Sequence, residues 1–343
     1  MPDQPEQPPP TATEATSRRT VLRAGAGVLG LAVIGAAAYD AASSGGGSGA
    51  RTNLTLVAPA SAGGGWDSAA REAQQALRAN AIVTNSTVLN IPGAGGTIGL
   101  SEVVNSLRGD ATNLMVMGMV MLGAIEVNGS GVTMEEVTPI ARLTDDYDVV
   151  VVPADSPLQS MDDLVAEWTQ DPSGFTWGGG SLGSVDQMII AQLALGEEID
   201  PPDVSYLAYS GGGELATSLL SGTIRASVSG YQDFKDQVDA GRLRALAVCA
   251  PEPVDIIDLP TLRDEGYDVS ITNWRGVVAP PGITDEERAE LEAIVTEWVQ
   301  TPEWQDAITR NQWTNTFLVG AEFETYLQEQ TEYVAGIWEE FGY

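Results

Sequence analysis

Four glycine-rich segments each stand where a strand-like apolar run ends and a helical pattern begins. They span residues 61–67, 92–99, 178–186 and 209–214. Glycine lets the backbone approach a ligand closely with its N–H groups turned inward. The helix that follows adds unpaired N–H donors and a partial positive charge at its start. Such segments suit a carboxylate or another small anion. One alone is more simply a tight turn, but four in one chain favour a ligand cleft.

Asp67 and Asp186 hold matching places in the first and third segments. Either can cap its helix by accepting backbone N–H groups. Either can instead order its segment and accept a hydrogen bond from a ligand hydroxyl or protonated carboxyl, and the sequence leaves both roles open. The hydroxyl donors in or near these segments are Ser181, Ser184, Ser210 and Ser229.

Arg275 is the best single cation for an anionic ligand, with an ion pair on the surface or between domains as the alternative. It directly precedes Gly276 in a late apolar run. Trp66 and Trp274 flank a glycine-rich segment and this run, and both are candidates to line the pocket.

The composition excludes several kinds of chemistry. The chain has no His, one Lys (Lys235) and one Cys (Cys249), so a His-based triad, a His metal site and an internal disulfide are ruled out. The net charge of −32 argues against nucleic acid as a partner. The second glycine-rich segment lacks a G-x-G-x-x-G match, because Ile98 follows Thr97 where the last glycine would stand, and no G-x-x-x-x-G-K-[ST] motif occurs anywhere in the chain. We therefore expect no cofactor and no metal.

Short apolar runs alternate with helical patterns from residue 52 onward, which predicts an α/β fold with mostly parallel sheets flanked by helices. A helix is expected from 66 to 79, where Ala69, Ala73, Ala76 and Leu77 share one face. Strands are expected at 54–57, 87–91, 114–117, 149–152, 175–177, 204–207, 225–228, 243–248 and 276–279.

One internal echo accompanies this alternation. Residues 149–157 and 276–284 both read as a strand, a Pro and a helix-capping segment. Such a repeat is typical of a protein with two similar lobes, although it is common in α/β chains.

Residues 1–50 read as an export signal followed by a linker. Arg18-Arg19 precede a short, weakly apolar stretch at 24–38, which matches a twin-arginine signal. Ala36–Ala38 offer a small-residue cleavage site, and residues 43–49 form a Gly/Ser tether. The sequence leaves open whether the signal is removed or anchors the protein to the outer face of the membrane.

Nine ordered runs carry a family resemblance: 54–71, 89–100, 137–143, 150–164, 209–222, 229–234, 240–248, 259–269 and 273–283. Through them the chain, from about residue 52 to its end, resembles the substrate-binding component of the tripartite tricarboxylate transporter systems. One departure lies in the third glycine-rich segment, where Gln187 stands in place of an expected His.

The resemblance implies a two-lobed periplasmic-binding-protein-like fold of type II with a cleft between the lobes. We expect residues 51–145 with 273–343 in one lobe and residues 146–272 in the other. The resemblance implies that backbone N–H groups, hydroxyls and ordered water in the loops between the lobes hold the ligand. Together with Arg275 from the analysis above, the expected binding residues are Ser61, Gly64, Gly65, Trp66, Asp67, Gly180, Ser181, Ser184, Asp186, Gly212, Gly213 and Ser229.

The expected function is that of an exported, non-enzymatic, monomeric receptor. It would capture a di- or tricarboxylate such as citrate and deliver it to the membrane subunits of a tripartite transporter. Two alternatives stay open. One is an exported hydrolase that works through paired carboxylates, and the other is a ligand sensor for a membrane kinase. The donor argument also predicts that Gly64→Pro abolishes binding, because proline has no N–H.

Overall fold

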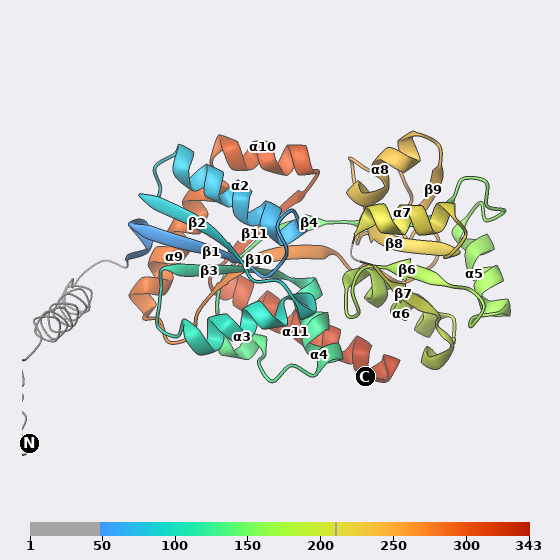
Figure 1. Cartoon of the computed structure of the whole chain (residues 1–343), viewed down its shortest axis with the longest axis horizontal. Coiled ribbons are helices and arrows are strands. Elements are labelled where there is room, and N and C mark those ends of the chain that lie inside the picture. Colours follow the sequence, from blue (N-terminus) through green and yellow to red (C-terminus); the bar gives the residue numbers. More distant parts are fainter. Residues whose placement is uncertain (1–48, 210) are drawn as a thin grey trace, which may run out of the picture. The chain divides into compact units, whose positions relative to one another are not determined.

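The computed structural model describes residues 49–209 and 211–343, which form two β-sheets with helices on their faces (Figure 1). The export signal and linker predicted within residues 1–50 therefore lie almost wholly outside the described residues. Ser210, one of the candidate hydroxyl donors, also lies outside them. The first sheet contains β1 (Asn53–Ala58), β2 (Asn85–Asn90), β3 (Asn113–Gly118), β4 (Thr138–Asp146), β10 (Asn273–Ala279) and β11 (Thr314–Val319). The second contains β5 (Asp148–Pro153), β6 (Trp177–Gly179), β7 (Tyr206–Ala208), β8 (Ala226–Gly230) and β9 (Leu243–Cys249).

Ten α-helices connect these strands in the described residues. They are α2 (Gly65–Ala79), α3 (Thr97–Ser106), α4 (Met119–Asn128), α5 (Met161–Gln170), α6 (Val185–Gly196), α7 (Gly212–Leu220), α8 (Tyr231–Asp239), α9 (Asp285–Val299), α10 (Pro302–Asn311) and α11 (Ala321–Phe341). None of the helices in this part of the chain is long and apolar enough to cross a membrane.

The two sheets share one strand order. The first runs β2-β1-β3-β10-β4-β11, and the second runs β7-β6-β8-β5-β9. Three strands in each are parallel. The next strand, β10 or β5, is antiparallel to both of its neighbours. The α/β fold with two sheets is confirmed, but the pairing is more mixed than the sequence predicted. The reason is that β5 enters its sheet directly from the first sheet and β10 enters from the second, so each runs against the strands it joins.

The internal echo marks the two equivalent strands β5 and β10. Each leads to a helix whose first turn has a side-chain cap. Ser160 Oγ accepts the N–H of Asp163 before α5, and Thr284 Oγ1 accepts the N–H of Glu287 before α9. The repeat seen in the sequence therefore corresponds to equivalent positions in the two sheets.

All nine expected strands are present, with ends shifted by a few residues. The sequence analysis missed β4 and β11. Strand β4 contains Pro139 and ends in Asp145-Asp146, and β11 begins with polar residues, so neither has a simple apolar pattern.

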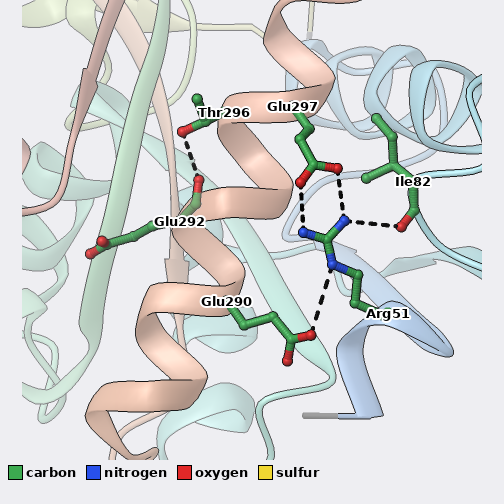
Figure 2. A network of polar contacts seen from close by, with 6 residues as sticks. All are labelled: Arg51, Ile82, Glu290, Glu292, Thr296 and Glu297. Carbon is green, nitrogen blue, oxygen red and sulfur yellow. Dashed lines mark hydrogen bonds and ion pairs between the residues drawn. The ribbon is translucent and has the colours of Figure 1, made fainter. Parts of the chain in front are cut away.

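Arg51 ties the start of the first sheet to α9 (Figure 2). Its Nη1 and Nη2 donate to the carboxylate of Glu297 at 2.7 Å each, and its Nε lies 3.8 Å from Glu290. Nη1 also donates to the carbonyl oxygen of Ile82 at 3.4 Å. Because the side chains of Arg51 and Glu297 are 36 % and 48 % exposed, water screens the ion pair, which contributes about 1 kcal/mol or less. It fixes the position where the described chain enters β1.

The half of the protein built on the first sheet and the half built on the second also contact each other backbone to backbone. A Cβ atom built on Gly123 of α4 would lie 2.1 Å from the carbonyl oxygen of Gly183, which precedes α6. Gly183 has a φ of +80°, and a Cβ there would lie 2.8 Å from the carbonyl oxygen of Gly123. No side chain fits between these two segments, so glycine is required on both sides.

Candidate functional site

A cavity of about 480 Å³ is lined by residues from both halves of the protein. It lies at the carboxyl ends of parallel strands, where open α/β sheets bind ligands. The half built on the first sheet contributes Ala60, Gly63, Gly65, Trp66, Ser68, Val120, Asp146, Asn273, Arg275, Asn311 and Trp313. The second contributes Asp186, Ser229, Gly230, Gln232 and Asp233.

Five of the thirteen expected binding residues line this cavity. They are Gly65, Trp66, Asp186, Ser229 and Arg275. The other eight are Ser61, Gly64, Asp67, Gly180, Ser181, Ser184, Gly212 and Gly213, which lie in the adjoining turns and helix starts.

The first glycine-rich segment presents the start of α2 to the cavity. No side chain caps this helix. Its first intrahelical hydrogen bond runs from the N–H of Ser68 to the carbonyl oxygen of Gly64, so the N–H groups of Gly65 and Trp66 precede the helical ladder. The N–H of Gly64 already donates to the carbonyl oxygen of Ser61 at 3.1 Å. The reason given for the effect of Gly64→Pro was therefore wrong, because this N–H belongs to a turn. Gly65 lines the cavity, and its N–H lies outside the helical ladder.

Asp67 holds this segment in place through the hydrogen bonds that its carboxylate accepts. Its carboxylate accepts hydrogen bonds at 2.8 Å from the N–H of Gly63, from Nε of Arg71 and from Nδ2 of Asn90. Burial opposes ionisation, but these donors lower the pKa of Asp67 to about 2. With its oxygens occupied by the protein, Asp67 fixes the loop that carries Gly65.

Asp67→Asn is expected to destabilise the protein by about 2 kcal/mol at pH 7, because an ionised, hydrogen-bonded carboxylate is lost. The pKa of Asp67 is lower in the folded chain than its ordinary 3.8. Its ionised form therefore stabilises the fold above that value, and this contribution disappears as the pH falls from about 4 to about 2. Denaturant unfolding of both proteins at several pH values measures the difference. A difference that stays constant with pH would contradict the electrostatic explanation.

The second glycine-rich segment does not line the cavity but packs against Trp66, which does. A Cβ on Gly96, whose φ is +94°, would lie 2.6 Å from the ring of Trp66 and 2.7 Å from Cε of Met121. Glycine at this position therefore leaves room for the Trp66 ring next to the backbone. The segment thus positions a residue that lines the cavity without lining it itself.

The third glycine-rich segment brings Asp186 to the cavity. Oδ2 of Asp186 accepts the N–H of Gly180 at 2.7 Å, and the hydroxyl of Tyr206 donates to the carbonyl oxygen of Gly180 at 2.8 Å. Ser184 caps α6 by accepting the N–H of Gln187, whose own side chain accepts the N–H of Gly183. Gln187 is therefore a structural part of the loop. Ser181 is exposed and outside the cavity lining.

The fourth glycine-rich segment does not line the cavity itself but packs against Asp233, which does. A Cβ on Gly212 would lie 2.4 Å from Cβ of Asp233, so Gly212 lets α7 pack closely against a residue that lines the cavity. Gly213 is exposed, with open space where a Cβ would stand.

Arg275 is the cation of the cavity. Its side chain is 8 % exposed, and its Nη2 lies 2.9 Å from Oδ2 of Asp146. Its Nη1 is buried and makes no hydrogen bond within the described residues. Its guanidinium carbon lies 5.3 Å from the centre of the Trp313 ring. One edge of a buried guanidinium is therefore held by the protein, and another is left without a partner.

Trp274 faces the opposite way, so its expected place in the pocket was wrong. Side chains alternate along a strand, and Trp274 is fully buried against Phe323 and Tyr326.

The sequence analysis missed most of the polar lining. Asp146 and Asn273 are directly opposed in the register of β4 and β10, two strands far apart in sequence. Gln232 and Asp233 lie in the first turn of α8, whose N-cap is Gly230 and which has no side-chain cap. The strand–glycine–helix junction at Gly230 was the available signal, but a single glycine did not stand out beside the four richer segments.

The carboxylates around the cavity crowd one another. Ser229 Oγ donates to Oδ2 of Asp233 at 3.1 Å. Burial raises the pKa of both Asp186 and Asp233. Behind them Asp148 is 1 % exposed, and neither of its oxygens receives a hydrogen bond from the described residues. Burial, followed by the charges of Asp186, Asp146 and Asp233, raises the pKa of Asp148 well above its usual range.

Comparisons with known proteins agree with this architecture. The family model "Tripartite tricarboxylate transporter family receptor" matches residues 69–343. Protein BugT of Bordetella pertussis is 24% identical over 300 residues, which cover 84% of this chain and 89% of BugT.

Two solved structures show the same fold. The crystal structure of a TctC solute binding protein from Polaromonas, without ligand, is 25% identical with a TM-score of 0.69, over 84% of this chain and 98% of that one. MatC from Rhodopseudomonas palustris, with bound malate, is 20% identical with a TM-score of 0.69, over 83% of this chain and 98% of that one.

Proposed function

Because the chain belongs to the tripartite tricarboxylate transporter receptor family, we propose that it captures a small organic anion, a di- or tricarboxylate such as citrate. Family and fold are those of periplasmic solute-binding proteins. In the proposal the protein is exported by the twin-arginine route, acts as a monomer, and delivers its ligand to the membrane subunits of a tripartite transporter.

The unpaired Nη1 of Arg275 is the observation that carries the ligand class. A buried guanidinium nitrogen without a partner is costly, and a carboxylate oxygen is the acceptor that such a group binds best. The start of α2, without a side-chain cap, adds N–H donors at Gly65 and Trp66. The malate bound to the related MatC is a small carboxylate of this class.

Closure of two lobes follows from the same arrangement. In the proposal residues 51–145 with 273–343 form one lobe and residues 146–272 the other, so that Asp146, the last residue of β4, stands at the boundary between them. The cavity lining then divides between them, with Arg275 and Gly65 on one side and Asp186 and Ser229 on the other. A ligand that contacts both sides would favour the closed form, because it binds that form more strongly.

Thermal melts of the purified protein test the proposal. Citrate, tricarballylate, succinate, malate, glutamate, phosphate and a neutral sugar are compared at equal concentration. A ligand at about 100 times its Kd adds roughly 2.7 kcal/mol of stability, which raises Tm by about 5 °C. A rise confined to di- or tricarboxylates supports the proposal, and a rise only with the sugar, or with none of the anions, contradicts it.

The proposal also states that the bound solute leaves unchanged. NMR spectra of the ligand after prolonged incubation with the protein should show the starting compound only. Steady conversion into a product would instead favour an enzyme that uses the paired carboxylates of the cavity.

A further inference from the structure

The cavity that would hold an anion is itself rich in negative charge. Four ionisable acids and bases line it: Asp146, Asp186, Asp233 and Arg275. Asp146 forms the ion pair with Arg275, and the charge of Arg275 also reaches Asp233, so a single guanidinium stands against three acids that line the cavity. Asp148 lies buried behind them.

A plain dicarboxylate would bring two further negative charges to this site. Repulsion between like charges grows as water is excluded, so an anion without any positive group is poorly matched to these acids. A metal ion could offset them, but the described residues contain no group of three or more acids, Cys or His arranged to hold one. The positive charge is therefore best supplied by the ligand.

We propose that the ligand is an amino dicarboxylate whose ammonium group binds Asp186 and Asp233 while a carboxylate binds Arg275. This inference rests on the proposed function, since it assumes that the cavity holds a carboxylate. The two acids are close together, because Ser229 donates to Asp233 and also lies within hydrogen-bonding reach of Asp186. The independent sign of a ligand is the buried, unpartnered Nη1 of Arg275. Its partner and the partner of the acids must carry opposite charges, and an amino acid carries both.

The raised pKa values of Asp186 and Asp233 agree with this arrangement. Burial is the main cause of each shift. A bound ammonium group would favour the ionised form of both acids and offset the cost of their burial.

Calorimetric titration of the full-length protein with succinate, malate and aspartate tests the proposal. The three share one four-carbon diacid skeleton and carry hydrogen, hydroxyl or ammonium at C2. Glutarate and glutamate repeat the comparison with one more carbon. At pH 7.5 an amino dicarboxylate is expected to bind about 10- to 100-fold more tightly than its matched diacid, as for a hydrogen bond between charged groups.

The outcomes separate this inference from the proposed function. If succinate or malate binds as tightly as aspartate, and glutarate as tightly as glutamate, the ammonium site is refuted while the carboxylate receptor stands. If succinate at pH 5.5 reaches the affinity of aspartate at pH 7.5, protons rather than an ammonium group neutralise the acids, and the inference is again refuted. If none of these carboxylates binds, both proposals fail.

Asp233→Asn provides the residue-level test. The amide keeps the shape that packs against Gly212 but loses the charge, so aspartate should bind at least 10-fold more weakly while succinate binds no more weakly than to the wild type. Asp236→Asn is the matched control, because Asp236 lies on the same helix α8 but outside the cavity lining. An equal loss for aspartate and succinate in the Asp233 variant would refute the ammonium site.

Discussion

Arg275→Gln is expected to weaken carboxylate binding by 100-fold or more and to destabilise the protein by about 3 kcal/mol. The affinity falls because a buried, charge-assisted donor is lost. The stability falls because Asp146, with its side chain only 16 % exposed, loses its ion-pair partner. Calorimetric titration and denaturant unfolding measure the two effects separately.

Arg142→Gln is the matched control for this substitution. Nη2 of Arg142 donates to both carboxylate oxygens of Asp145, at 2.6 and 2.7 Å, in a similarly buried pair that lies outside the cavity lining. It should destabilise the protein comparably and leave the affinity nearly unchanged.

The double variant Arg275→Gln/Asp146→Asn should recover much of the lost stability, because no unpaired charge remains. It should not recover binding. If either Arg275 variant binds the ligand like the wild type, Arg275 is not a ligand contact.

Gly123→Ala should destabilise the protein by about 2 kcal/mol or more, although alanine is ordinarily the better residue in a helix by about 1 kcal/mol. The new methyl group would meet the carbonyl oxygen of Gly183 at 2.1 Å, and overpacking of this kind typically costs about 1–3 kcal/mol. The segment before α6 must then shift. Since this segment leads to Asp186, ligand affinity should fall by about 10-fold, an order-of-magnitude expectation for a displaced contact.

Gly336→Ala isolates the effect of that contact. Gly336 lies inside α11, and no atom lies within 4 Å of the position of an added Cβ. The same chemical change should stabilise the protein there by about 0.5–1 kcal/mol and leave affinity unchanged. Equal melting points for the two variants would show that α4 and the Gly183 segment are not in close contact.

Local signals predicted the elements and the general place of the site. Apolar runs identified nine strands, and the echo between residues 149–157 and 276–284 identified two equivalent ones. Glycine-rich junctions indicated the start of α2 and the loop before α6 because a backbone that approaches a ligand needs glycine regardless of what lies elsewhere in the fold.

Long-range pairing decided the rest, and it leaves no local trace. Asp146 reaches the cavity because β4 pairs with β10 in the register that sets it opposite Asn273. Strand alternation then decides that Arg275 faces the cavity and Trp274 the core. The second and fourth glycine-rich segments look like binding loops in the sequence. Only tertiary packing shows that Gly96 supports Trp66 and that Gly212 supports Asp233.

The chain crosses to the second sheet before β5 and returns to the first sheet before β10. These two crossings also set the order in which a growing chain can complete its structure. All strands of the second sheet lie within residues 148–249, so this sheet can assemble as soon as that stretch has left the ribosome. In the first sheet β10 is inserted between β3 and β4. A gap therefore stays open in its centre until residue 279 has been synthesised, and the half that begins first is finished last.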